Sequence, residues 1–197
     1  MKNMGYLLII LGLAAIGVGL RIVLKKEEPS RPIPTAAKQE KVEFQENKAK
    51  GDAFEAFVVK SFSPKYFTLQ EWRSDKYVEG RYAVSNHFPD LEVQFELHSK
   101  GIKDVFAIEC KWRQNYYKGG VEWAQNYQVE KYKEYAQKSG VPVFVVIGIA
   151  GTPDQPNELY IVPLTSLTSN TISKDTLSQY KKEKGMFYWD TEEKALR

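Results

Sequence analysis

The stretch PDLEVQFELHSKGIKDVFAIECKW, from Pro89 to Trp112, decides the fold of this chain. Its first half alternates polar and apolar residues with a period of two, which is typical of a β-strand with one buried face. Its second half is mostly apolar, and Glu109 and Lys111 interrupt it. Charged side chains in such a strand are costly unless they are paired or take part in chemistry. The stretch therefore predicts a β-hairpin that carries a polar site.

The turn of the predicted hairpin sets which residues face each other. With the tip at Lys100-Gly101, Asp90 lies opposite Lys111. Glu92 then lies opposite Glu109, about 5 Å away at Cβ, and two facing glutamates repel unless a cation lies near them. The turn lacks the Asn-Gly pattern that fixes register, so a slip by one or two residues is open. The proximity of Asp90 to the second strand's charged pair survives such a slip.

These residues resemble a known signature. Asp90, followed on the next strand by Glu109-Cys110-Lys111, is similar to the motif of the PD-(D/E)XK nuclease superfamily, and most similar to its Mrr-type restriction endonuclease and Holliday-junction resolvase branch. Glu55 stands in a preceding helix, where that family often places an acid. Gln128 and Tyr132 match the QxxxY pattern of a subset of these nucleases. The order and spacing of these short motifs carry the resemblance.

The resemblance implies a fold of the α/β class. A restriction-endonuclease-like domain has an α-β-β-β-α-β core, in which helices flank a central mixed sheet. The chain supplies matching elements around the hairpin: a helix over 52–62, a strand over 66–72, a helix over 121–138 and a strand over 141–149. Weaker signals predict a helix over 38–50, a strand over 159–163, a helical segment over 174–184 and a last strand over 186–189. Propensity alone supports only a mixed α/β protein.

The resemblance also implies the chemistry. Asp90, Glu109 and the backbone carbonyl of Cys110 are expected to bind Mg²⁺ or Mn²⁺, because these hard cations prefer oxygen ligands. Lys111 is expected to orient the attacking water or to neutralise developing charge. Glu55 is expected to add a third carboxylate, directly or through water. The plainer alternatives are a cross-strand salt bridge for the hairpin residues and an exposed helical position for Glu55.

Five residues are expected to contact nucleic acid: Arg113, Tyr117 and Lys118 after the hairpin, and Gln128 and Tyr132 on the next helix. The loop after the hairpin mixes basic, amide and aromatic side chains, which suits phosphates and stacked bases. The two helical residues rest on the resemblance alone. Ordinary packing is the alternative for the aromatic residues.

The composition permits this function without requiring it. The chain has 197 residues and is 43% hydrophobic, which fits one folded domain with appendages. A net charge of +3 allows nucleic-acid binding through a local basic patch. The single cysteine, Cys110, excludes an intrachain disulfide and a cysteine-rich zinc site.

Residues 5–24 are predicted to form a single-pass membrane anchor. They are apolar apart from Tyr6 and Arg21, and they suffice to span a bilayer if Arg21 snorkels. Arg21, Lys25 and Lys26 predict that the following chain lies in the cytoplasm, by the positive-inside rule. A cleaved signal peptide is the alternative, which the lack of an Ala-x-Ala site after the apolar run disfavours.

The predicted organisation has three parts: an anchor over 1–24, a charged, proline-containing tether with a weak helix over 25–47, and a nuclease-like domain over 48–197. The expected protein is an Mg²⁺- or Mn²⁺-dependent nuclease at the inner membrane, which cleaves DNA in defence against foreign DNA or in DNA processing. The alternative is an inactive module of the same fold that binds nucleic acid or a protein partner at the membrane. DNA versus RNA, strandedness and a homodimeric assembly stay open.

Overall fold

The computed structural model describes residues 36–73, 77–78, 81–82, 88–183 and 185–197. The chain divides into two compact units, Met1–Lys41 and Val42–Arg197. The predicted anchor over 5–24 and the tether up to residue 35 lie outside the described residues. Within the described ranges, no helix combines the length and the apolar character that crossing a membrane requires.

A five-stranded mixed sheet with the strand order β1-β4-β5-β7-β8 lies at the centre of the unit Val42–Arg197. Its strands are β1 (Phe67–Trp72), β4 (Leu91–Leu97), β5 (Ile102–Arg113), β7 (Val143–Ile149) and β8 (Glu158–Pro163). Strands β5 and β7 run parallel, and the other neighbours run antiparallel. A parallel pair needs a long crossover connection, which β6 (Gly120–Glu122) and α3 (Asn126–Ser139) provide. The predicted α/β class with a central mixed sheet is confirmed.

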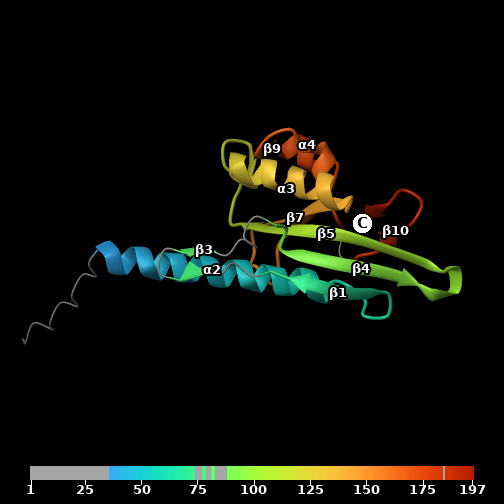
Figure 1. The fold of residues 1–197 in the computed structure, drawn as a ribbon. Helices are drawn as coiled ribbons and strands as arrows, with labels where there is room; N and C mark the ends of the chain where they lie inside the picture. Colours follow the sequence, from blue (N-terminus) through green and yellow to red (C-terminus); the bar gives the residue numbers. More distant parts are fainter. Residues whose placement is uncertain (1–35, 74–76, 79–80, 83–87, 184) are drawn as a thin grey trace, which may run out of the picture. The chain divides into compact units, whose positions relative to one another are not determined.

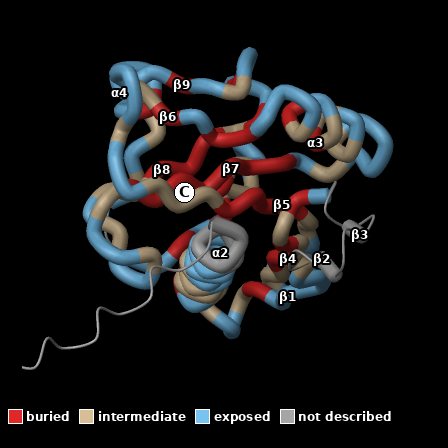
Figure 2. Tube along the Cα trace, turned by 90° about the vertical axis from the view of Figure 1, so that its left-hand side faces the viewer, coloured by how far each residue is buried: buried red, intermediate tan, exposed pale blue. Residues whose placement is uncertain are grey.

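Helices cover both faces of this sheet (Figure 1). On one face, α2 (Ala36–Lys60) packs through Phe54 and Val58 against residues of β4 and β5, among them Leu91, Val93, Phe106, Ile108 and Cys110. On the other face, α3 packs against residues that include Ala107, Val145, Ile147 and Val162. Figure 2 shows the buried strands β5, β7 and β8 between these helices. Because both faces are covered, β7 is buried along its whole length.

Several element boundaries differ from those the sequence predicts. The helices expected over 38–50 and 52–62 form one continuous α2. The helix expected from residue 121 begins at Asn126, because Gly120–Glu122 pairs instead with β9 (Thr171–Ser173). The remaining elements are short: β2 (Tyr77–Val78), β3 (Arg81–Tyr82), η2 (His98–Lys100), η3 (Leu164–Ser166), α4 (Lys174–Ser178), β10 (Trp189–Asp190) and β11 (Ala195–Leu196). The helical segment predicted over 174–184 thus ends at Ser178. The last strand predicted over 186–189 overlaps β10 at Trp189 alone.

The β4–β5 hairpin forms as predicted, but its register differs. Leu91 pairs with Ile108 and Glu92 pairs with Ala107, so the predicted facing pair of Glu92 and Glu109 is wrong. Continued by one residue, this register places Glu109, and not Lys111, opposite Asp90, so the predicted facing pair of Asp90 and Lys111 is wrong as well. The reason is the turn, in which the 3₁₀ helix η2 and a left-handed Gly101 (φ 64°) replace a two-residue tip.

A β-bulge in the edge strand β1 changes which way its last residues point. Leu69 pairs with Val93, but Glu71 pairs with Glu92, so one extra residue lies in β1. Side chains of a regular strand alternate between the two faces, and a bulge shifts that alternation by one residue. Phe67 and Trp72, an odd number of residues apart, can therefore both lie on the face that α2 covers.

Two glycines, Gly148 of β7 and Gly51 of α2, offer a matched test of the packing between α2 and the sheet. A Cβ atom on Gly148 would lie 2.5 Å from Phe54 Cε2, whereas one on Gly51 would have nothing within 4 Å. Gly148→Ala is expected to lower the free energy of unfolding by about 1–3 kcal/mol, because it overpacks the core. Gly51→Ala is expected to raise it by about 0.5–1 kcal/mol, because alanine favours the helix. Urea denaturation of both variants tests this, and a shift of the same sign in both would contradict it.

Candidate active site

The candidate site lies where β4 and β5 separate. Asp90 comes just before β4, and its Oδ2 atom accepts a hydrogen bond of 2.7 Å from the backbone N–H of Cys110. The ladder between the two strands ends at the pair of Leu91 and Ile108, so a carboxylate takes the place of the next backbone acceptor. In an extended strand the N–H and C=O of one residue point to the same side. The Cys110 carbonyl therefore faces the side on which Asp90 lies.

Glu109 and Lys111 extend from β5 toward the face that α3 covers. Glu109 is 1% exposed, and its Oε1 atom lies 2.5 Å from Lys111 Nζ. Among the described side chains, Glu109 Oε2 is the one buried polar atom without a hydrogen-bond partner. A buried carboxylate oxygen without a donor is costly, and a bound cation is one way to satisfy it.

The charges of these residues influence one another strongly. Burial and the nearby charge of Glu109 raise the pKa of Asp90 well above its usual value, against the opposing effect of Lys111. Burial would lower the pKa of Lys111, but the carboxylates of Glu109 and Asp90 outweigh it and raise that pKa, so the amine stays protonated. Burial, followed by the charge of Asp90, raises the pKa of the Cys110 thiol, which fits an inert buried side chain.

Glu55 approaches the site from α2. Its carboxylate Oε2 accepts a hydrogen bond of 2.7 Å from the indole Nε1 of Trp72, and the residue is 9% exposed. Its charge contributes to the raised pKa values of Asp90 and Cys110, so it lies within electrostatic reach of both. The role of Glu55 as a third acid stays a prediction, and its partner Trp72 was not expected from the sequence.

The residues present fit a hard divalent cation. Among the described residues, Asp90, Glu109 and Glu55 supply three carboxylates, against the ammonium of Lys111 and the guanidinium of Arg113, so these groups carry more negative than positive charge when all are ionised. The buried, unpartnered oxygen of Glu109 points to the same need. Across the described part of the chain, no three His, Cys, Asp or Glu side chains are arranged to hold a metal ion. A cation here would therefore bind two carboxylates, the Cys110 carbonyl and water, which suits Mg²⁺ because it keeps several waters.

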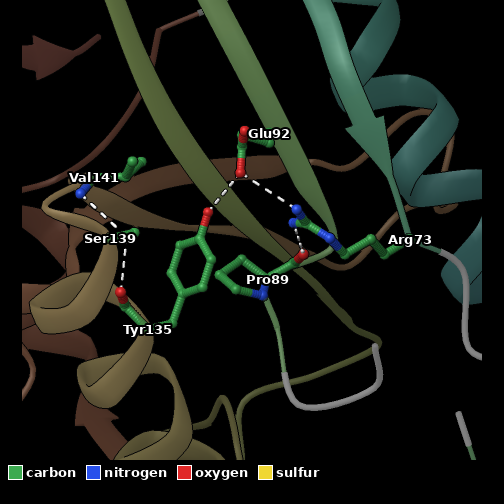
Figure 3. A network of polar contacts seen from close by, with 6 residues as sticks. All are labelled: Arg73, Pro89, Glu92, Tyr135, Ser139 and Val141. Carbon is green, nitrogen blue, oxygen red and sulfur yellow. Dashed lines mark hydrogen bonds and ion pairs between the residues drawn. The ribbon is translucent and has the colours of Figure 1, made fainter. Parts of the chain in front are cut away.

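A polar network that the sequence did not reveal lies beside the site (Figure 3). Arg73 donates from Nη1 to the carbonyl of Pro89 at 3.2 Å, and its Nη2 lies 3.2 Å from Glu92 Oε2. Tyr135 of α3 donates to the same oxygen at 2.6 Å, and burial together with this bond raises the pKa of Tyr135 to about 12. Glu92 therefore pairs with Arg73 and Tyr135, not with Glu109.

Gln128 and Tyr132 of α3 have structural partners in the segment just before that helix. Gln128 Oε1 accepts a hydrogen bond of 2.9 Å from the backbone N–H of Gln125, which caps the start of the helix. Tyr132 is 2% exposed, and its ring packs on Trp123 with 6.1 Å between the centroids. The structure thus places one residue at a helix end and the other in the core, and their roles in substrate binding stay predictions.

The three predicted contact residues after the hairpin lie in different settings. The Arg113 guanidinium donates to the backbone carbonyls of Trp112 and Glu122, which braces the loop. Tyr117 is 70% exposed and precedes a tight turn in which Lys118 and Gly119 have positive φ values of 48° and 78°. That conformation is typical of a two-residue hairpin turn. The turn presents an aromatic ring and an ammonium group to solvent.

Similarity to known proteins is found at the level of structure. No protein-family model matches the chain, and a search of curated proteins finds no match. Among solved structures, the chain is similar to Hjc, a Holliday junction resolvase from the archaeal hyperthermophile Archaeoglobus fulgidus. The TM-score is 0.44 and the sequence identity is 16%, over 68% of this chain and 95% of that chain. A Holliday junction resolvase belongs to the class of protein that the motifs resemble, but a likeness this distant carries no conclusion about this chain.

The electrostatics of Asp90 predict how stability depends on pH when no metal is present. A carboxyl whose pKa rises on folding binds protons more tightly in the folded state, so it lowers stability once the pH exceeds its unfolded pKa of about 4. Asp90→Asn is therefore expected to raise the unfolding temperature at neutral pH and to reduce the loss of stability on going from about pH 4 to pH 8. Thermal unfolding with a chelator measures both effects.

Asp104 serves as the matched control. Burial acts against ionisation there too, but bonds from Lys194 and Trp189 lower its pKa. A lowered pKa stabilises the folded state above the unfolded pKa, and this stability is lost as the pH falls. Asp104→Asn is therefore expected to lower the unfolding temperature at neutral pH. If the two variants shifted stability in the same direction, the electrostatic account of Asp90 would be wrong.

Proposed function

We propose that the protein is a metal-dependent nuclease that hydrolyses phosphodiester bonds of DNA. The observation that carries the proposal is the buried Glu109 carboxylate, which is bound to Lys111 on one oxygen and has no partner among the described residues on the other. Asp90 lies close enough for the charge of Glu109 to raise its pKa. Buried acids beside a lysine, at a place where two strands separate, are suited to binding a cation and a phosphate together.

Each residue has a distinct role in this proposal. Asp90, Glu109 and the Cys110 carbonyl would hold Mg²⁺ or Mn²⁺, which would supply positive charge for the phosphate and lower the pKa of a water. Lys111, protonated and fixed by Glu109, donates hydrogen bonds to oxygens on which negative charge develops. Glu55 contributes the third negative charge from the α2 side.

The substrate-binding proposal centres on the exposed turn after β5. Lys118 provides a phosphate contact, and Tyr117 provides a face on which an unpaired base can stack. Arg113 acts mainly by bracing this turn, since its guanidinium already binds two backbone carbonyls. The choice of DNA over RNA rests on the resemblance to the nuclease superfamily.

Substitutions at the site should separate metal binding from cleavage. Asp90→Asn and Glu109→Gln keep the side-chain volume but remove a charged ligand, so they are expected to weaken Mn²⁺ affinity by more than about tenfold. Lys111→Ala is expected to bind Mn²⁺ but to lose about 10²–10³-fold in cleavage rate, as for the loss of one donor to a developing charge. Calorimetry with Mn²⁺ and cleavage of duplex, branched and single-stranded DNA and of RNA measure these effects.

Lys194→Ala is the control for this experiment. Lys194 also pairs with a carboxylate of β5, Asp104, but that residue lies seven positions before Lys111, about 23 Å along the strand. The Lys194→Ala variant is therefore expected to cleave at the wild-type rate. Wild-type cleavage by Lys111→Ala would reject the nuclease proposal. A wild-type protein that binds nucleic acid but neither Mn²⁺ nor Mg²⁺ would instead favour an inactive binding module.

We further propose that residues 5–24 anchor the protein in the inner membrane and that the unit Val42–Arg197 lies in the cytoplasm. The apolar run and the basic residues Arg21, Lys25 and Lys26 behind it support this orientation. A reporter that is active only in the cytoplasm, fused after Arg197, is expected to be active in the membrane fraction. Mass spectrometry that finds a mature chain beginning after residue 20 would refute the anchor.

A further inference from the structure

Arg73 holds both peptide groups that flank the Asp90 Cα atom. Its backbone N–H donates to the Asp90 carbonyl at 2.7 Å, and its Nη1 donates to the Pro89 carbonyl at 3.2 Å. The orientations of these two peptide groups fix the backbone dihedrals of Asp90, and these direct its side chain. That side chain in turn reaches the amide of Cys110.

The guanidinium of Arg73 is itself fixed on several sides, as Figure 3 shows. Glu92 binds Nη2 at 3.2 Å, and the Tyr135 hydroxyl holds that carboxylate at 2.6 Å. The rings of Phe88 and Tyr135 lie 5.7 and 6.0 Å from the guanidinium carbon. A planar guanidinium can donate in two directions at once, which a lysine ammonium on its flexible stem does not reproduce.

The bulge in β1 gives Arg73 this position. Because the bulge shifts the alternation of side chains, Trp72 points to Glu55 of α2, whereas Arg73 points to Tyr135 of α3. In an unbulged strand the two side chains would exchange faces. Bulges often redirect side chains beside active sites, and this one directs consecutive residues to acids on opposite sides of the sheet.

The partners of Arg73 distinguish it from a substrate-binding arginine. Its side chain is only 17% exposed, and its guanidinium is engaged by Glu92 and Pro89. An arginine that binds phosphate needs donors directed at the substrate. Arg73 therefore acts through Asp90.

We propose that Arg73 is a positioning residue, which keeps the Asp90 carboxylate on the Cys110 amide and thereby ready to bind the metal. The first part concerns the protein without metal or substrate. Only the second part, the consequence for metal binding, rests on the proposed nuclease function.

Hydrogen exchange in the metal-free, full-length protein tests the first part. In Arg73→Lys, which keeps the charge and the backbone N–H, the Cys110 amide is expected to exchange at least about tenfold faster than in the wild type, because its bond to a carboxylate is a strong one. The Val145 amide in β7 is expected to keep its protection. Arg197→Lys is the matched control, since this arginine pairs with Asp190 at 3.6 Å outside the network, and it should change neither amide.

Two outcomes would overturn the proposal. One is unchanged exchange of Cys110 in a folded Arg73→Lys protein. If the Arg73→Lys protein loses protection of its amides throughout β5 and β7, that variant is unfolded and cannot test the proposal. The Tyr135→Phe variant then provides the test, because it removes only the hydroxyl that holds Glu92. In Tyr135→Phe, the Cys110 amide is expected to exchange faster than in the wild type, by less than about tenfold. Unchanged exchange of this amide is the second outcome that would overturn the proposal.

Mn²⁺ titration and steady-state cleavage test the second part. Arg73→Lys is expected to weaken Mn²⁺ binding by about 10–100-fold, as changes next to metal ligands do, and to lower kcat while KM for DNA stays unchanged. Faster exchange at Cys110 together with wild-type Mn²⁺ affinity would refute the link to metal binding. Faster exchange in a protein whose wild type neither binds Mn²⁺ nor cleaves would keep the positioning role and reject the nuclease.

Discussion

The hydrogen bond between the Cys110 amide and the Asp90 carboxylate is the interaction on which the site depends. Up to the pair of Leu91 and Ile108, backbone groups hold β4 and β5 together, and beyond it a side chain takes over. The strands can then separate without leaving the Cys110 N–H unpaired, which would be costly in a buried strand. The separation leaves the backbone of β5 next to Asp90, while Glu109 is buried on β5. An acidic site inside a packed domain results.

The sequence predicted the parts of this arrangement that follow from local pattern. The alternation in 91–97 and the apolar run in 143–149 correspond to β4 and β7, because burial imposes those periods directly. The cost of burying charge singled out Glu109 and Lys111, which do form a pair. The predicted register of the hairpin was wrong because the turn contains the 3₁₀ helix η2, which no residue pattern in the turn predicts. The proximity of Asp90 to β5 survived because its side chain, and not the ladder, makes the contact.

Other features depend on contacts that no local pattern encodes. Arg73 and Trp72 reach the acids only because of the bulge at 69–71, and the identities of the bulged residues do not reveal it. Tyr135 is 43 residues from its partner Glu92. The capping role of Gln128 could have been predicted from the sequence. A glutamine at the third position of a helix often accepts a hydrogen bond from the backbone N–H of the N-cap residue. The apolar face of α3 was likewise a signal for the burial of Tyr132.

The bulge also makes the length of the edge strand matter more than its composition. Insertions and deletions are tolerated best in exposed loops, whereas a one-residue change in a paired strand moves its side chains to the opposite face. In β1 only Phe67 is buried, yet loss of one residue before Trp72 would turn an indole away from α2 and direct a guanidinium toward its apolar layer. Substitutions at positions 68–71 leave the number of residues in β1 unchanged, so they do not alter which way Trp72 and Arg73 point. Evolution can therefore vary the chemistry of this exposed strand widely while its number of residues stays fixed.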